Sequence, residues 1–168
     1  MPLIDLIQAE FAGSFDATPP AIVALRLIAA LILGGIIGVE REVNSDGAGL
    51  RTHILVSLAA CLFALLAFEM LADPTGEGSD PLRLIEAVTA GVAFLAAGSI
   101  ITSGGKIKGL TTGAGMWMAG AIGLSCGVGN IALGAMASVL AVIVLWVFWH
   151  LSRKLSSASD SDGEGGTR

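Results

Sequence analysis

Residues 20–39 read PAIVALRLIAALILGGIIGV, an apolar run in which Arg26 is the only charged side chain. Pro20 suits the first turn of a helix, where the missing N–H of proline is not needed. With a rise of about 1.5 Å per residue, a helix of this length spans about 30 Å, close to the thickness of the hydrocarbon core of a bilayer. The run is therefore predicted to cross a membrane.

Four later runs have the same character, with Glu69 and Glu86 as their only charged residues. Of the 168 residues in the chain, 54% are apolar and 14% are charged, whereas about a quarter of a soluble domain is charged. We therefore predict an all-α fold, a polytopic transmembrane helical bundle with five spans. The predicted spans are residues 20–39, 54–72, 84–102, 110–128 and 131–149.

The two ends of the chain differ from the spans. In residues 1–19, Leu3, Ile7 and Phe11 recur at helical spacing between acidic residues, which predicts a short helix on the membrane surface. No basic residue precedes the first span, so we expect no cleaved signal peptide. Residues 151–168 are rich in Ser, Asp and Gly, which is typical of a disordered tail.

The distribution of Lys and Arg predicts the orientation of the bundle. With five spans, most basic residues fall on one side of the membrane, and only Arg83 lies near a span end on the other side. Because basic residues favour the cytoplasmic side, we place the amino terminus outside and the carboxyl terminus inside. The net charge of −5 does not suit a nucleic acid partner. The inner basic residues are Arg41, Arg51, Lys106, Lys108, Arg153 and Lys154.

Small residues recur along single helix faces, most clearly at Gly115, Ala119, Gly123 and Gly127. In a bilayer, small residues let helix backbones approach one another closely. We expect these faces to pack helices within the chain, to form the seam of an oligomer, or to line a permeation path. The glycines assigned to helix packing are Gly34, Gly38, Gly91, Gly98, Gly115 and Gly123.

Charged residues within a bilayer are rare and are candidates for function. The predicted topology puts Arg26, Glu69 and Glu86 in the outer leaflet, as an outer-leaflet charge cluster. One interpretation is that this cluster holds a proton or a cation between helices. The other is that both carboxylates reach the interface and that Arg26 is paired or extends its head toward water.

A denser group of polar residues lies at the inner ends of the spans. It serves either as ordinary interfacial anchoring or as a functional site. Thr52 is a candidate cap for the second span, and the Arg51 guanidinium is predicted to pair with Glu40 or Glu42. The inner-face candidates are Glu40, Arg41, Glu42, Gly49, Arg51, Thr52, His53, Lys106, Thr111 and Thr112.

No catalytic motif stands out in the sequence. The Gly105–Lys106 pair lacks the spacing of a phosphate-binding loop, and there is no HExxH zinc motif. His53 and Ser57 share a helix face, but that span supplies no acid to orient the histidine. We predict no catalytic residue, no cofactor and no metal site. Cys61 and Cys126 are predicted to lie at different depths and not to form a disulfide.

Several motifs, taken in order, resemble the MgtC/SapB family of bacterial inner-membrane proteins. They are GVERE (38–42), AGLRTH (48–53), DPLR (80–83), GVAFLAAG (91–98) and GLTT (109–112), followed by Trp117 and Ala121-Ile122-Gly123. The resemblance covers about residues 20–150. The chain departs from the family pattern at Ala93, Ala96 and Ala97, where glycines are common, and at Glu86, where a small or uncharged residue is expected. We expect a short form of the family, without the cytoplasmic carboxy-terminal domain of the longer members.

The resemblance implies a multi-pass inner-membrane protein, with a periplasmic amino terminus, that supports adaptation to low magnesium or to host-like stress. In that family direct magnesium transport is doubted, and modulation of membrane energetics or of other membrane proteins is the usual proposal. We therefore expect a regulator that contacts another membrane complex or self-associates within the lipid bilayer. The alternative is a small proton- or cation-conducting transporter or channel.

Overall fold

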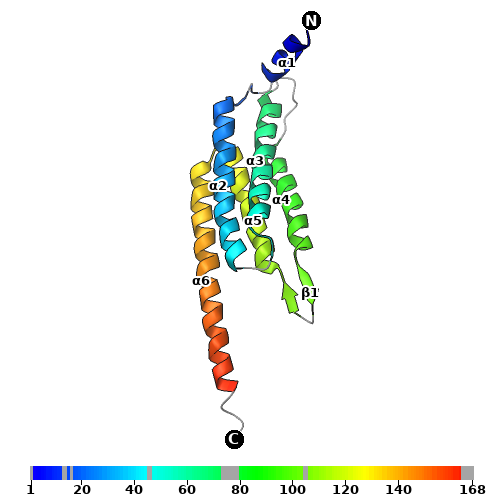
Figure 1. Ribbon diagram of the computed structural model, residues 1–168. Coiled ribbons are helices and arrows are strands. Elements are labelled where there is room, and N and C mark those ends of the chain that lie inside the picture. The colour runs from blue at the N-terminus through cyan, green and yellow to red at the C-terminus, as the bar shows by residue number, and fades with distance from the viewer. Residues whose placement is uncertain are drawn as a thin grey trace.

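The structure is a computed structural model that describes residues 2–12, 15, 17–44, 47–72, 80–103 and 106–163. Figure 1 shows an elongated bundle formed by α2 to α6, with α1 beyond one of its ends. The predicted all-α fold is confirmed, apart from one short hairpin. The elements are α1 (Leu3–Ala12), α2 (Pro20–Asn44), α3 (Leu50–Ala72), α4 (Pro81–Gly98), β1 (Ile101–Ser103), β2 (Lys106–Lys108), α5 (Leu110–Gly127) and α6 (Ile131–Gly163).

We name the two ends of the bundle by the helix α2. At the Pro20 end, α2, α4 and α6 begin and α3 and α5 finish, so α3 and α5 run in the same direction (Figure 1). At the Asn44 end, α2 finishes, α3 begins, and the β1–β2 hairpin joins α4 to α5.

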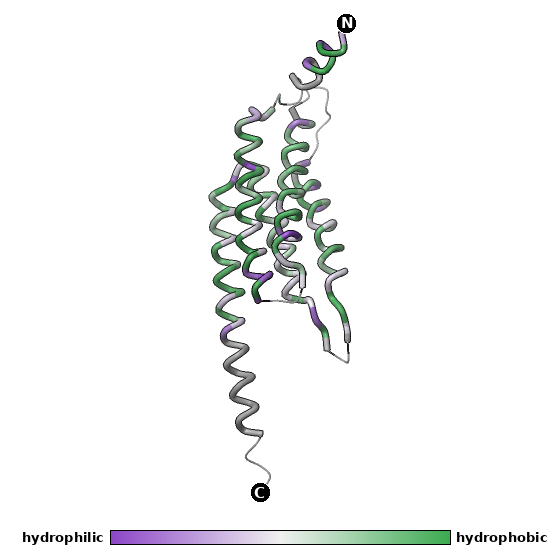
Figure 2. Tube along the Cα trace, in the orientation of Figure 1, coloured by the Kyte–Doolittle hydropathy of each residue, from purple (hydrophilic) through white to green (hydrophobic). Residues whose placement is uncertain are grey.

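Among the described residues, three helices are long and apolar enough to cross a membrane, namely Pro20–Asn44, Leu50–Met70 and Ile131–His150. The helices α4 and α5 have 18 residues each, near the lower limit for a span. Figure 2 shows that the bundle helices are mainly hydrophobic along their length. Many of their large apolar side chains are exposed, and Phe94 is 81% exposed. An apolar outer surface of this extent suits lipid rather than water, so the chain is a membrane protein.

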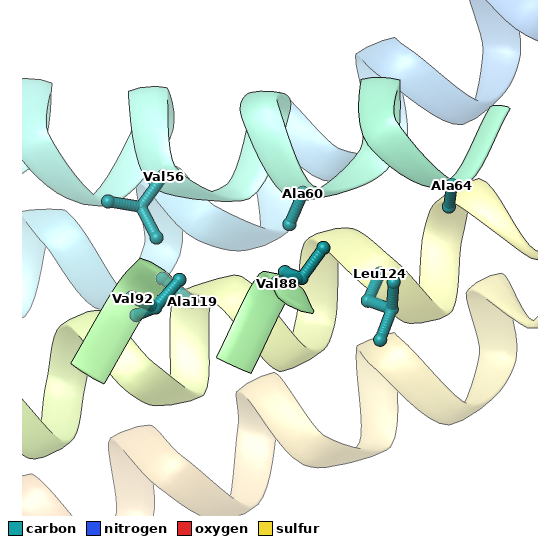
Figure 3. Packing of buried hydrophobic residues seen from close by; sticks show 7 residues of the cluster. All are labelled: Val56, Ala60, Ala64, Val88, Val92, Ala119 and Leu124. Carbon is teal, nitrogen blue, oxygen red and sulfur yellow. The ribbon is translucent and has the colours of Figure 1, made fainter. Parts of the chain in front are cut away.

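The helix α5 lies in the centre of the bundle and contacts α2, α3, α4 and α6. One apolar cluster joins α3, α4 and α5, and Figure 3 shows its side chains gathered between these helices. A second cluster joins α2, α3 and α5. The members of the first are Val56, Ala60, Ala64, Val88, Val92, Ala119 and Leu124, and those of the second are Ala30, Ile37, Cys61, Leu65, Ile122 and Cys126.

The two cysteines were expected at different depths, and that prediction is wrong. Both are fully buried free thiols of the second cluster. The reason is the close approach of α3 and α5, because a Cβ added at Gly127 would lie 2.6 Å from the Cys61 carbonyl oxygen. Parallel helices in this register bring residues near the middle of α3 to the end of α5.

The six glycines assigned to packing fall into two groups. A Cβ added at Gly34 would lie 2.5 Å from the Ser57 Cβ, and one added at Gly38 would lie 2.8 Å from the Leu50 Cα. Added Cβ atoms at Gly115 and Gly123 would also meet α3, at His53 Nε2 and at the Ser57 carbonyl oxygen, and the contact at Gly123 would be the closer one. By contrast, no atom lies within 4 Å of a Cβ added at Gly91 or Gly98, so within this chain those two α4 glycines face open space.

The third span was predicted as residues 84–102, but α4 stops at Gly98. After Gly98 the chain forms the β1–β2 hairpin, in which Thr102 pairs with Ile107. Both residues are β-branched, and β-branched residues favour strands. Gly109, with φ 89°, then starts α5, in a conformation that only glycine adopts readily.

The ends of the chain also differ from expectation. For residues 151–168 disorder was predicted, yet α6 continues to Gly163. Once a helix is nucleated, each further residue adds a backbone hydrogen bond at little cost, so weakly helical residues extend α6. The last five residues lie outside the described part of the chain. In the segment 1–19 a helix forms as α1, and Leu3 and Ile4 are exposed on it.

Candidate functional site

A polar cluster is buried at the Asn44 end, where α2, α3 and α5 meet. It consists of Glu40 and Arg41 from α2, His53 from α3 and Thr112 from α5, and we call it the inner polar cluster. Its exposed fractions are 9% for Glu40, 7% for Arg41, 0% for His53 and 3% for Thr112. All four residues were among the inner-face candidates, and the fold brings them together.

The two charged side chains of this cluster, Glu40 and Arg41, form a long ion pair. The Arg41 Nη1 lies 3.8 Å from Glu40 Oε2, which is long for a hydrogen-bonded pair. The other Glu40 oxygen accepts a hydrogen bond from Asn44 Nδ2 at 3.2 Å. The Arg41 Nη2 donates to Thr112 Oγ1 at 3.5 Å. Buried charges with such loose partners retain much of their desolvation cost.

His53 is fixed at one ring nitrogen. Its Nδ1 lies 2.8 Å from the Gly49 carbonyl oxygen, so in the neutral ring Nδ1 donates the proton and Nε2 is an acceptor. Nε2 faces α5 at Gly115, where an added Cβ would lie 2.9 Å from it. Gly115 was assigned only to helix packing, but its missing side chain also makes room for the histidine.

Three buried side-chain atoms of this cluster make no hydrogen bond in the described structure: Glu40 Oε2, Arg41 Nε and His53 Nε2. Each unmet group costs about 1–3 kcal/mol. An acceptor, a donor and a ring nitrogen in one small region are suited to exchanging hydrogen-bond partners or a proton. Sites that keep such a cost are candidates for function.

The neighbouring inner-face candidates do other work. Glu42 Oε2 accepts a hydrogen bond from the Leu50 backbone N–H at 2.9 Å and packs against Gly49, so Glu42 caps α3. That position was predicted for Thr52, which instead lines a cavity of about 480 Å³ beside Met116. Arg51 was predicted to pair with Glu40 or Glu42, but the guanidinium beside Glu40 is that of Arg41.

The remaining candidates of the inner face lie outside this cluster. Arg51 and Thr111 are exposed, and the side chain of Lys106 in β2 lies outside the described structure. Ser57 was considered in the sequence only as a catalytic partner of His53 and was not among the inner-face candidates. Its Oγ donates to the Ala30 carbonyl at 2.8 Å and joins α3 to α2. Its position one helical turn after His53, on the same face, was the available signal.

The charges predicted for the outer leaflet have separate partners. Arg26 Nη1 donates to the Gly127 carbonyl at 2.8 Å, so it caps the carboxyl end of α5. Glu69 accepts the backbone N–H groups of Ala17 and Thr18 at 2.9 and 3.0 Å, just before α2 begins. Both contacts match the sign of the helix dipole.

Glu86 is exposed on α4. Within the described residues, Arg26 forms no ion pair with Glu69 or Glu86. The same residues contain no group of three His, Cys, Asp or Glu side chains placed to hold a metal ion.

The bundle has helices of membrane-spanning length and a buried charged pair at one end. These features place the protein in the class of all-α integral membrane proteins with an internal polar site. Residues 27–154 match the model of the MgtC family. This chain therefore belongs to the MgtC family, in agreement with the resemblance of its motifs.

Curated relatives support this membership. The chain is 41% identical over 134 residues to the "Putative magnesium transporter YhiD" of Escherichia coli, covering 78% of this chain and 62% of that protein. It is 37% identical over 126 residues to "Protein MgtC" of Brucella abortus, covering 75% and 51%. It is also 37% identical over 123 residues to "Protein MgtC" of Salmonella typhimurium, covering 72% and 51%.

The chain thus spans between about half and three-fifths of the length of these relatives. No solved structure gives a significant match. The name of the Escherichia coli relative refers to magnesium transport.

Proposed function

We propose that this protein crosses the bacterial inner membrane five times, with α2 to α6 as the spans. Arg41, Arg51 and Lys108 all belong to the Asn44 end, which supports a cytoplasmic position for that end. The Pro20 end then faces the periplasm. With about 27 Å of length each, α4 and α5 reach across most of the hydrocarbon core.

Within this arrangement the protein acts as a regulator that supports adaptation to low magnesium or stress. It does so by contact with another membrane complex or by changing membrane energetics, and it is not an enzyme. The observation that carries this proposal is the inner polar cluster, in which Glu40, Arg41 and His53 each keep a buried atom without a hydrogen bond. A site with exchangeable partners at the ends of three helices can switch between two packings when the surroundings change.

The contacts at the Pro20 end of the bundle favour a regulatory function over ion conduction. There Arg26 and Glu69 are occupied as helix caps. Between the two ends, Ile37 and Ile122 are almost completely buried in the second apolar cluster. A path for a hydrated ion needs polar groups through this region, and the described core offers apolar packing there.

The test compares growth with ion flux. In a strain that needs this protein at low magnesium, Glu40→Gln and Arg41→Gln should insert normally but fail to restore growth. The matched control is Lys108→Gln, an exposed basic residue at the same end, which should restore growth like wild type. Liposomes containing only the purified protein should show no proton or magnesium flux above protein-free liposomes. Normal growth with both cluster variants contradicts the proposal.

The second candidate function is a small proton or cation transporter. It is favoured by the Glu40 oxygen that makes no hydrogen bond in the described structure and by the name of the relative YhiD. The same liposomes decide between the two functions. If wild type conducts ions and Glu40→Gln does not, the protein is a transporter and the regulatory function is wrong.

A further inference from the structure

An apolar groove of about 570 Å³ runs between α3 and α4. Every residue that lines it is apolar, including Phe63 on α3 and Ala87 and Gly91 on α4. No atom lies within 4 Å of a Cβ added at Gly91, so the chain leaves this part of the groove unfilled. The groove extends from Met70 and Leu84 near the Pro20 end to Val56 and Leu95 toward the Asn44 end.

One basic residue of the described structure adjoins the lining of the groove at the Pro20 end. Arg83 directly precedes the lining residue Leu84, in the first turn of α4, and its side chain is exposed. In the described structure it forms no ion pair. The nearby Asp80 carboxylate accepts the Leu82 N–H at 2.9 Å as the cap of α4, so it is engaged with the backbone.

Two further acidic residues near this end are described, Glu69 and Glu86. Glu69 is bound to the backbone N–H groups of Ala17 and Thr18. Glu86 lies five residues before Gly91, and at about 100° per residue this puts the two about 140° apart around α4. Among the described residues, the Arg83 side chain therefore has no ion-pair partner, and it lies next to an apolar groove between two helices.

We infer that this groove binds a phospholipid, with one acyl chain between Phe63 and Gly91 and the phosphate on the Arg83 guanidinium. The inference rests on the proposed crossing of α4, which puts Arg83 at the depth of the outer headgroups. The groove supplies apolar surface along the chain, and the planar guanidinium supplies two N–H donors matched to a phosphate. Charge complementarity favours this occupant over a purely apolar partner helix.

The test is native mass spectrometry of the purified full chain in detergent, with phosphatidylglycerol or with diacylglycerol of the same acyl chains. Wild type should retain one phosphatidylglycerol and bind it about tenfold more tightly than diacylglycerol. Arg83→Gln should remove most of this preference. Equal binding of both lipids by wild type overturns the phosphate contact.

A second pair of variants tests the groove itself. Gly91→Phe fills it and should abolish lipid retention, whereas Ala90→Phe, on the neighbouring exposed position, should retain the lipid. If Gly91→Phe does not fold, Gly91→Leu serves in its place. Equal retention by both positions overturns the inference. A wild-type dimer that Gly91→Phe dissociates would assign the groove to a second copy and also overturn it.

These results are separable from those for the proposed function. Lipid retention is measured without growth or flux, so a regulator without this lipid site would fail here and still pass the growth test. A wrong membrane arrangement would be seen independently by the cysteine labelling described below.

Discussion

At the scale of single residues, the inner polar cluster depends on the absence of a side chain at Gly115. A Cβ there would lie 2.9 Å from His53 Nε2, which displaces a fully buried ring. We expect Gly115→Ala to lower the stability of the protein by about 1–3 kcal/mol, as overpacking commonly does. Thermal unfolding in detergent measures this effect.

The control for this substitution is Gly91→Ala, in the interior of α4. That position has open space, and alanine is favoured over glycine in a helix by about 0.5–1 kcal/mol. Its melting temperature should equal or exceed that of wild type. If the two alanine variants melt alike, the packing of His53 against Gly115 has no energetic weight.

Arg26 and Glu69 offer a second test at this scale. Since they cap α5 and the start of α2 separately, their effects should add. The interaction energy in a double-mutant cycle of Arg26→Gln and Glu69→Gln should be within about 0.5 kcal/mol of zero. Greater stability in the double variant than in either single variant would instead reveal an ion pair.

At the scale of elements, α5 is the central helix on which the others pack. Its glycines set how closely the neighbouring helices approach it. A Cβ added at Gly123 would meet the backbone oxygen of Ser57 in α3, and a backbone cannot move aside as a side chain does. Gly123→Ala should therefore push α3 and α5 apart and cost more than Gly115→Ala.

The measurement is the melting temperature together with the fraction of monodisperse protein after purification. Ala121→Ser is the matched control on the exposed face of α5 and should behave as wild type. A Gly123→Ala variant as stable as this control would contradict the close packing of the two helices.

At the scale of the whole molecule, the five-span arrangement predicts which positions reagents reach from outside. In a background with Cys61→Ala and Cys126→Ala, an impermeant thiol reagent should label Ser14→Cys and Glu77→Cys in intact cells. It should label Asp46→Cys, Lys106→Cys and Ser157→Cys only after permeabilisation. Labelling of Lys106→Cys in intact cells would reverse or break the topology.

The amino-acid sequence by itself determined the helical fold and the membrane environment, because long apolar runs specify both without reference to a partner. It also located Glu40, Arg41, His53 and Thr112 as residues of one end, since loop positions follow from the spans.

Only the tertiary structure decided which atoms meet. The Arg26 side chain binds a carbonyl group 101 positions away in the chain, and Cys61 shares a cluster with Cys126. Likewise, Arg41 rather than Arg51 stands beside Glu40. Such contacts depend on the direction, register and spacing of helices that are distant in sequence. Local sequence patterns do not predict these quantities. Helix formation is a local property, whereas the pairing of helix faces is a property of the whole packed bundle.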